Sequence, residues 1–518
     1  MCWLPVLCLT LCVLAACGGP EGSSHQEAAE PVEEAAQGTS DGAVAGGSET
    51  KAGQGIVAGN GRSLVLISVD TLRADALGIY GGGGSPRIDA FAEGGWVFDQ
   101  AMTPMPVTRP SHASMLTALH PRSHGVVSNA YVLDPSIPTV TEALAEAGWR
   151  TGAFTGVKLL APGSGLERGF EVFEAPLKGE HVVASEVIPP AVEWLKEVAP
   201  QPFFLWLHVY DPHMPYSPPE PWFVPPPAPW STEELPEFSR PALYPIAEKE
   251  GGNVPAALLA WALEQYAAEV SYVDAQLQEL FSTLEAVAPE AAVILTADHG
   301  ECFSKGYFFE HGPCLYEGSL HVPMVLKAPG RVEPGGRSQA QVSVIDVAPT
   351  LLDLAELTIP QSYRGRSLLS LMDGTPSGTP GDTLSATVDG AGGAEAAPLL
   401  LQRPLYDEDA QRRRQRRRSR ISSVAGEPVA TWIPGEVLGL RFGPESGTSW
   451  KYLASAAGEE LYRLQEDPDE RNNLVTSEPQ EAASLRAQLR QELSATPLKA
   501  GAEALDDEMR RTLESLGY

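Results

Sequence analysis

Seven polar side chains lie at or near the ends of apolar segments, and their types could hold metal ions and supply a nucleophile. The set comprises three carboxylates, three imidazoles and one hydroxyl: Asp70, Thr108, Asp211, His213, Asp298, His299 and His311. Such a set suits two Zn²⁺ or Mn²⁺ ions. Each residue alone is weak evidence, because a histidine beside a strand is usually a satisfied structural residue. Their joint placement is stronger evidence, because buried carboxylates are costly without a cation.

The segments around these side chains predict the scaffold. Residues 63–69 form a continuous apolar run typical of a buried parallel strand, and residues 203–208 and 292–296 form two more. Helical patterns occupy residues 139–147 and 267–284. This alternation predicts an α/β fold with a mostly parallel sheet flanked by helices. Ligands of such sheets bind at the carboxyl ends of the strands, where the polar residues occur.

The N-terminus predicts export. Residues 4–16 are apolar but too short for a membrane-spanning helix, and they run into Leu14-Ala15-Ala16-Cys17, which resembles a lipoprotein cleavage box. We therefore predict a signal peptide over residues 1–16, a lipid on Cys17 and a disordered acidic tether over residues 17–61. The predicted location is the periplasm or cell envelope, with the membrane contacted through this lipid only. An ordinary secretory signal is the alternative.

Charge and composition limit the partners. The net charge of −31 argues against nucleic acid or an anionic lipid face as the main partner. Residues 214–256 are proline-rich and predict an irregular loop over one face. Residues 373–425 predict an irregular insertion, and its arginine run from Arg412 to Arg418 reads as a solvated loop, with polyanion binding as the alternative. Residues 450–452 and 460–462 predict adjacent strands of a C-terminal subdomain that spans residues 426–518.

Two cysteines remain once the predicted leader and the lipidated position are set aside. Cys302 and Cys314 form a candidate disulfide in an exported protein. Two buried thiols are the alternative.

Six ordered motifs resemble those of the sulfatase family, within the alkaline phosphatase superfamily. They are LVLISVDTLRADALGIYG, TRPSHASMLTALHPRSHGV, HVYDPHMPY, LTADHGE, HGPCLYEGSLHVPMVLKAPG and VIDVAPTLLDLAEL. The likeness runs from about residue 62 to the C-terminus and includes GEELYRLQEDPDERNNL. It implies a catalytic α/β domain over residues 62–372, a C-terminal subdomain built on a small antiparallel sheet, and hydrolysis of a sulfate or phosphate ester through a covalent intermediate.

Four departures from the sulfatase pattern point towards phosphate chemistry. Sulfatases oxidise a Cys or Ser to formylglycine, and Thr108 stands at that position. The other departures are Asp70-Thr71 for two aspartates, Asp298-His299 for Asp-Asn, and His311 for a lysine. Added imidazoles suit two transition-metal ions better than one Ca²⁺. The resemblance therefore implies a threonine nucleophile of a phosphoesterase.

The implied site divides into two metal positions. One is expected to be held by Asp70, Asp298 and His299 beside Thr108, and the other by Asp211, His213 and His311. Further candidates for substrate contact or support are Arg73, Arg109 and His124.

Two other functions stay open at the level of sequence. One is a sulfatase proper with a single Ca²⁺, and the other is an inactive envelope-binding lipoprotein. The expected substrate is a small-molecule, glycan or lipid-linked ester, and the oligomeric state is not predicted.

Overall fold

The computed structural model describes residues 59–176, 180–372, 397–499 and 502–504. The predicted signal peptide, Cys17 and all but the end of the tether lie outside these residues, so lipoprotein export stays a prediction. Among the described residues, no helix has both the length and the apolar character needed to cross a bilayer.

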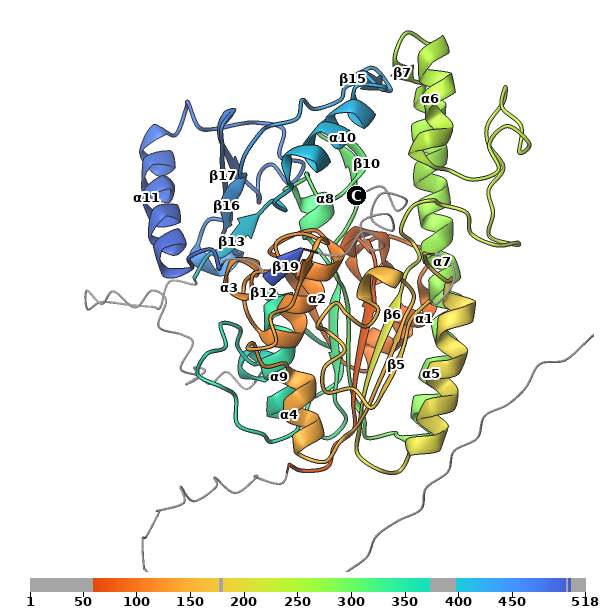
Figure 1. Ribbon diagram of the computed structural model, residues 1–518, viewed down its shortest axis with the longest axis vertical. Helices are drawn as coiled ribbons and strands as arrows, with labels where there is room; N and C mark the ends of the chain where they lie inside the picture. Colours follow the sequence, from red (N-terminus) through yellow and green to blue (C-terminus); the bar gives the residue numbers. More distant parts are fainter. Residues whose placement is uncertain (1–58, 177–179, 373–396, 500–501, 505–518) are drawn as a thin grey trace, which may run out of the picture. The chain divides into compact units, whose positions relative to one another are not determined.

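A central sheet of eight strands organises the molecule (Figure 1). In spatial order the strands are β12 (Gly336–Ser343), β2 (Trp96–Met102), β11 (Met324–Lys327), β8 (Ala292–Ala297), β1 (Leu64–Val69), β6 (Phe203–Val209), β4 (Arg150–Thr155) and β5 (Val172–Glu174). Only β11 runs antiparallel to its neighbours in this sheet. The predicted α/β fold with a mostly parallel sheet is confirmed.

The three strands predicted from apolar runs are the centre of this sheet. β1 pairs with β6 on one side and β8 on the other, both in parallel. Every residue of the three strands is buried. A strand flanked on both edges and covered on both faces must be apolar throughout, which explains why these three runs were so plain in the sequence.

Helices cover both faces of the sheet (Figure 1). On one side lie α1 (Pro86–Glu93), α5 (Ala184–Val198) and α7 (Ala256–Val287), which pack on one another. On the other lie α2 (Thr108–Thr117), α4 (Val140–Glu146) and α9 (Val347–Leu354). The start of α4 is fixed by a capping box, in which Thr139 and Glu142 satisfy each other's backbone N–H groups.

A second sheet forms the C-terminal subdomain. Its antiparallel strands are β13 (Leu399–Gln402), β16 (Leu438–Arg441), β17 (Trp450–Ser455) and β18 (Gly458–Arg463), and α11 (Pro479–Ala495) packs on them. The predicted neighbours at residues 450–452 and 460–462 lie in β17 and β18, where Tyr452 faces Leu461. This sheet has its own small apolar core.

Two zones predicted to be irregular contain regular elements. The proline-rich zone holds α6 (Arg240–Lys249) and β7 (Asn253–Val254). The described part of the insertion holds β13, α10 (Glu408–Arg418) and β14 (Ser423–Val424). The Asp407 side chain accepts a hydrogen bond from the Ala410 N–H and caps α10, and arginine itself favours helix. The arginine run is therefore helical.

The remaining elements are short. They are α3 (Pro121–His124), α8 (Glu317–Leu320), the hairpin of β9 (Cys302–Ser304) and β10 (Tyr307–Glu310), β3 (Tyr131–Val132) paired with β19 (Ala502–Ala504), and β15 (Glu427–Pro428), which pairs with β14. Short 3-10 helices occupy Ala74–Ala76, Gly78–Tyr80, Lys158–Leu160, Val344–Asp346, Leu368–Leu371 and Pro444–Ser446.

Candidate active site

The register of the three central strands places carboxylates and imidazoles side by side. Val69 of β1 lies level with Val209 of β6 and Ala297 of β8. Asp70 and Asp298 therefore follow neighbouring strands at the same height. His208, the last but one residue of β6, lies level with Ser68. The site is assembled by the ends of parallel strands, as the sequence predicted.

The side chains meet at distances longer than hydrogen bonds. His299 Nε2 lies 3.7 Å from Asp70 Oδ1 and 3.5 Å from Asp298 Oδ2. His208 Nε2 lies 3.6 Å from Asp70 Oδ2. All four side chains are at most 1% exposed. The possible ligand atoms of Asp70, Asp298 and His299 lie within 4.8 Å of one another. Such spacing leaves room for an ion among them.

Several of these buried atoms have no hydrogen-bond partner among the described residues. They are both carboxylate oxygens of Asp70, Asp298 Oδ2, His299 Nε2 and both ring nitrogens of His208. Orphaned buried polar atoms are rare, because each carries its full desolvation cost. Carboxylate oxygens and neutral imidazole nitrogens are metal donors. The donor set fits a divalent cation.

The pKa values of this group point the same way. Burial, with the negative charges of Asp298 and Glu301, holds the pKa of Asp70 well above its ordinary value. Burial raises the pKa of Asp298 to about 8. Burial, with the neighbouring His311, holds the pKa of His299 well below its ordinary value. A bound cation would reverse the penalty on the carboxylates and favour the neutral imidazole.

Thr108 begins α2 and is fully buried. Its hydroxyl lies close enough to Asp70 to lower the pKa of that carboxyl in part. Two contacts fix the start of α2: His112 bridges the Thr108 carbonyl oxygen (2.7 Å) and Ser68 Oγ (3.0 Å). The Ser111 hydroxyl also donates to the Asp298 carbonyl oxygen at 2.7 Å. These bonds tie the nucleophile candidate to the ends of β1 and β8.

The backbone next to Asp70 adopts an unusual conformation. Thr71 has φ 54°, in the left-handed region that a β-branched residue rarely occupies. In this conformation its N–H points at Asp298 Oδ1, 3.3 Å away. Strained backbone of this kind is found at functional sites, where the surroundings impose it.

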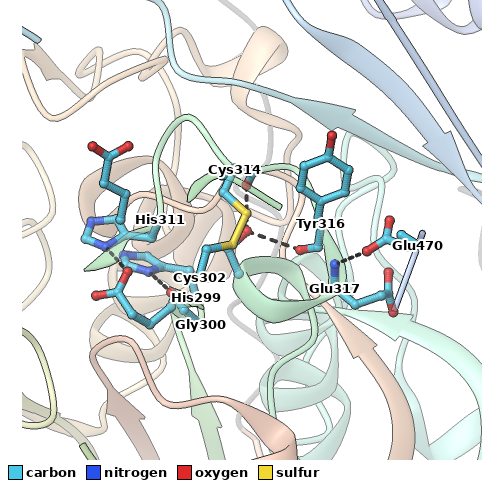
Figure 2. The surroundings of a disulfide bond; sticks show 12 residues. His299, Gly300, Cys302, His311, Cys314, Tyr316, Glu317 and Glu470 are labelled. Atoms are coloured by element: carbon cyan, nitrogen blue, oxygen red, sulfur yellow. Dashed lines mark hydrogen bonds and ion pairs between the residues drawn. A yellow bond between two sulfur atoms is a disulfide. The ribbon is translucent and has the colours of Figure 1, made fainter. Parts of the chain in front are cut away.

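Three histidines continue the site away from the strand ends. The ring of His311 stacks on that of His299, with centroids 4.3 Å apart (Figure 2). The centroid of the His311 ring lies 5.2 Å from that of the His213 ring. His311 Nδ1 lies 3.3 Å from Glu301 Oε1. His213 Nδ1 lies 2.7 Å from the Tyr210 hydroxyl and 2.6 Å from the Met214 carbonyl oxygen. Each ring is oriented by a contact at Nδ1.

Asp211 lies apart from the predicted second metal position. Its Oδ2 accepts a 2.7 Å hydrogen bond from the Ala184 N–H at the start of α5. Burial raises its pKa to about 6, and burial with the charge of Asp211 raises that of Glu269 to about 9. The two groups of possible ligands found among the described residues are Asp70–Asp298–His299 and His112–His208–Asp298. Neither includes Asp211, His213 or His311, so the structure does not assemble the second triad.

The three supporting candidates lie outside the ligand groups. Arg109 is fully buried, and its guanidinium donates to the carbonyl oxygens of Leu159, Asn129 and Tyr131. His124 contacts Ser114 Oγ at 3.1 Å and accepts from the Val126 N–H.

Arg73 is the third of these candidates, and its guanidinium pairs with Asp75 at 2.6 Å. It also lines a separate cavity of about 520 Å³, which includes none of the possible metal ligands. These contacts of the three candidates are to residues outside both ligand groups, and their predicted roles stay predictions.

Two candidate site residues, His208 and Glu301, were not predicted from the sequence. His208 lies inside an apolar run, where a histidine reads as a core residue. Glu301 is 1% exposed, contacts His311, and accepts from the Tyr216 hydroxyl at 3.2 Å. Its position three residues after Asp298 was the available signal.

A disulfide joins Cys302 to Cys314 and closes the segment that carries His311 (Figure 2). Of the two alternatives left by the sequence, the structure has the disulfide. It links the start of β9 to the loop before α8, so the hairpin and the His311 loop form one closed unit.

Comparisons with known proteins agree with this architecture. A family model described as Sulfatase matches residues 62–357. An arylsulfatase of Clostridium perfringens (strain 13 / Type A) is 24% identical over 385 residues, which cover 60% of this chain and 78% of the relative.

Solved structures share the fold. A phosphonate monoester hydrolase of Agrobacterium radiobacter aligns with a TM-score of 0.62 at 19% identity, covering 84% of this chain and 96% of the other. A protein solved with its substrate D-glucosamine-2-N,6-O-disulfate aligns with a TM-score of 0.63 at 18% identity, covering 84% and 98%.

Proposed function

The chain belongs to the sulfatase family of hydrolases, and from this premise we propose that it hydrolyses a phosphate ester with Thr108 as the nucleophile. The observation that supports this most directly is the hydroxyl of Thr108 beside Asp70, within a buried group of orphaned metal donors. A hydroxyl so placed can be activated without conversion to formylglycine.

The proposed metal ligands are Asp70, Asp298 and His299, with His208 within reach of the same space. Imidazole nitrogens favour Zn²⁺ or Mn²⁺ over Ca²⁺, which prefers oxygen ligands. When bound, the cation would lower the pKa of the attacking hydroxyl and offset charge on the transferring group. The proposal uses one ion, because Asp211, His213 and His311 do not form a second group of possible ligands among the described residues.

The residues of the chain have separate roles in the proposed reaction. Thr108 Oγ attacks phosphorus, its proton passes to Asp70, and the ester oxygen departs. The start of α2 presents the positive end of the helix dipole to the attacking oxygen. His311, whose ring stacks on that of His299, is the proposed donor of a proton to the leaving oxygen. Water then cleaves phosphothreonine and restores Thr108.

Hydrolysis of a sulfate ester is the second candidate. It is supported by the similarity to an arylsulfatase, and sulfate and phosphate esters share tetrahedral geometry. Against it stands the chemistry of Thr108, because oxidation of a threonine gives a ketone and not the aldehyde of formylglycine.

The deciding experiment compares substrates, metals and two threonines of α2. Wild type, Thr108→Ala and Thr108→Ser are assayed with p-nitrophenyl phosphate, bis-p-nitrophenyl phosphate and p-nitrophenyl sulfate, each with Zn²⁺, Mn²⁺ or Ca²⁺. Thr117→Ala is the matched control, because Thr117 is buried at the other end of α2. We expect phosphoester turnover with Zn²⁺ or Mn²⁺ and a loss of roughly 10³-fold or more in Thr108→Ala.

Two further readouts sharpen the result. Thr108→Ser should keep much of the activity, and acid quenching should trap phosphate on Thr108 in the wild type. Turnover of the sulfate ester with Ca²⁺ that survives Thr108→Ala would return the protein to the sulfate ester hydrolases.

A further inference from the structure

Two buried arginines and a third that is largely buried gather around Glu310, the residue before His311, on elements far apart in the sequence. Arg240 is the first residue of α6, Arg403 follows β13, and Arg418 is the last residue of α10. Arg403 and Arg418 are 3% and 6% exposed, and the side chain of Arg240 is 16% exposed. We refer to these three residues as the arginine cluster. Arginine is almost never buried without a partner.

The cluster has more positive charge than its described surroundings neutralise. Arg240 and Arg418 share one carboxylate, Glu310, which lies 3.6 Å from Arg418 Nη2. Arg403 has a backbone partner, the carbonyl oxygen of Gly435, and no ion pair among the described residues. The Nε atoms of all three arginines are buried without a hydrogen-bond partner in the described part of the chain. Two of the three guanidinium groups therefore share one carboxylate, and the third is paired with none among the described residues.

The pKa values reflect this surplus. Burial, together with repulsion by Arg418, lowers the pKa of Arg240 to about 10. Burial also lowers the pKa of Arg403, which Arg418 lowers further. Buried cations that repel one another are costly unless an anion joins them.

Aromatic rings cover the faces of two of the guanidinium groups. Arg418 lies over Tyr307 and Arg403 over Trp432, each 4.7 Å from the ring centroid. Stacking of this kind leaves the N–H edges of the guanidinium as the donors, and that planar fork matches the oxygens of phosphate, sulfate or carboxylate. The hydroxyl of Tyr406, a further donor, is also buried without a described partner.

The cluster adjoins the candidate active site. Glu310 precedes His311, whose ring stacks on His299. A side-chain carbon at Gly312 would lie 2.6 Å from the Tyr406 hydroxyl, so Tyr406 packs directly against the residue after His311. Arg240 is attracted by Glu301, the carboxylate in contact with His311. The arginines therefore lie next to the segment that carries His311.

We propose that the arginine cluster binds a second oxyanion group of the substrate, so that the preferred substrate is an ester carrying another phosphate, sulfate or carboxylate. This inference rests on the proposed function for the position of the reacting ester. The proposal assigns different roles to two arginines of α10. Arg418 faces the cluster, whereas Arg412 is 66% exposed and pairs with Glu408 one turn away.

The test uses metal-loaded full chain and a series of phosphonates as probes. Alkane-1,n-diphosphonates of increasing length are compared with the monophosphonate of the same chain, as inhibitors and by isothermal titration calorimetry. We expect one length to bind about tenfold or more tighter than its monophosphonate, because a buried charge-assisted contact contributes at least that much. Inorganic phosphate alone is the third probe, and it distinguishes a substrate-linked anion from a free one.

The variants are Arg418→Gln, Arg418→Lys and Arg403→Gln, with Arg412→Gln as the matched control on α10. Removing one of three mutually repelling cations should leave the fold intact, which thermal unfolding checks. The ratio of diphosphonate to monophosphonate affinity should fall towards one in Arg418→Gln and Arg403→Gln, recover in part in Arg418→Lys, and stay unchanged in Arg412→Gln.

The outcomes are distinguishable from those of the proposed function. Calorimetry needs no turnover, so the affinity ratio can be measured even if the enzyme cleaves no phosphate ester. An equal affinity for both probes at every length, or a ratio unchanged in the Arg418 and Arg403 variants, overturns the inference. Tight binding of inorganic phosphate to the arginines, without a preference for the diphosphonate, overturns it as well.

Discussion

Two buried groups of charged residues differ in how their charges are matched. At the junction with the C-terminal subdomain, Glu317 accepts from Arg441 Nε at 3.0 Å and from Lys451 Nζ at 2.9 Å. Lys451 also pairs with Glu470 at 2.8 Å, and Glu470 accepts from the Glu317 N–H (Figure 2). At the strand ends, Asp70 and Asp298 repel each other, and neither has an arginine or lysine as ion-pair partner among the described residues.

The same chemical group responds oppositely in these two places. The charges of Arg441 and Lys451 outweigh burial and hold the pKa of Glu317 well below its ordinary value. Burial raises that of Asp298 to about 8. Burial alone therefore does not decide the state of a carboxylate; the neighbours do. A carboxylate paired with cations of the chain stays ionised, whereas one without such a pair is a candidate for binding a metal cation.

The largest expected effect comes from Asp298→Asn. The asparagine oxygen can still accept from the N–H groups of Thr71 and His299, as Asp298 Oδ1 does, so the fold should survive. The orphaned Oδ2 is replaced by an amide NH₂ group, which has no negative charge and no free lone pair with which to bind a metal ion. We expect the proposed phosphoesterase activity to fall by roughly 10³-fold or more and bound metal to be lost. The measurements are kcat/KM and metal content by mass spectrometry.

Asp274→Asn is the control for this variant. Asp274 is equally buried, but it accepts from the N–H groups of Arg87 and Ile88 and lies in neither ligand group. The Asp274→Asn variant should lower stability and leave the metal content unchanged. Full metal occupancy in Asp298→Asn would contradict the division into matched and unmatched groups.

The next effect is on stability, at Glu317→Gln. This change leaves Arg441 and Lys451 buried with a weakened partner, and the expected loss is about 3 kcal/mol in the free energy of unfolding. Denaturant unfolding measures it, and metal content should not change. Glu408→Gln, which breaks an exposed pair on α10, should cost well under about 1 kcal/mol. An equally small loss of unfolding free energy in Glu317→Gln and Glu408→Gln would contradict the stabilising role of the buried pairs.

The smallest effect is a pH dependence from the same carboxylate. The pKa of Glu317 is lower in the folded protein than its ordinary value of 4.5, so its stabilisation is complete above about that pH and is lost as pH falls below it. Burial raises the pKa of Glu470, which acts in the opposite direction. The measurement is therefore the difference in free energy of unfolding between wild type and Glu317→Gln. This difference should shrink as the pH is lowered from about 4.5 to about 3. A difference that is constant over this range would contradict it.

Much of the fold was readable from the sequence because burial on both faces leaves no choice of residue type. β1, β6 and β8 lie within one residue of their predicted bounds for this reason. α10 was missed because an all-polar helix has no apolar periodicity, and its cap at Asp407 and the propensity of arginine decide it.

The site was predictable in part for a related reason. Asp70 and Asp298 directly follow adjacent strands, so the sheet brings them together. Asp211 comes one position later relative to its strand, since Tyr210 stands level with Asp70, and its side chain caps α5 instead. Distance along the chain from a strand end does not specify which neighbour a side chain meets.

The central position of β1 has a consequence for synthesis on the ribosome. β1 is the first strand of the sheet to be synthesised, and its partners come from much later in the chain. The hydrogen bond from the Thr71 N–H to Asp298, for example, joins residues 227 positions apart. At typical rates of translation this interval takes roughly 10 to 45 seconds. β6 is made before β8, so β1 has a partner for one edge first, and its other edge stays open to pairing with other chains until β8 emerges.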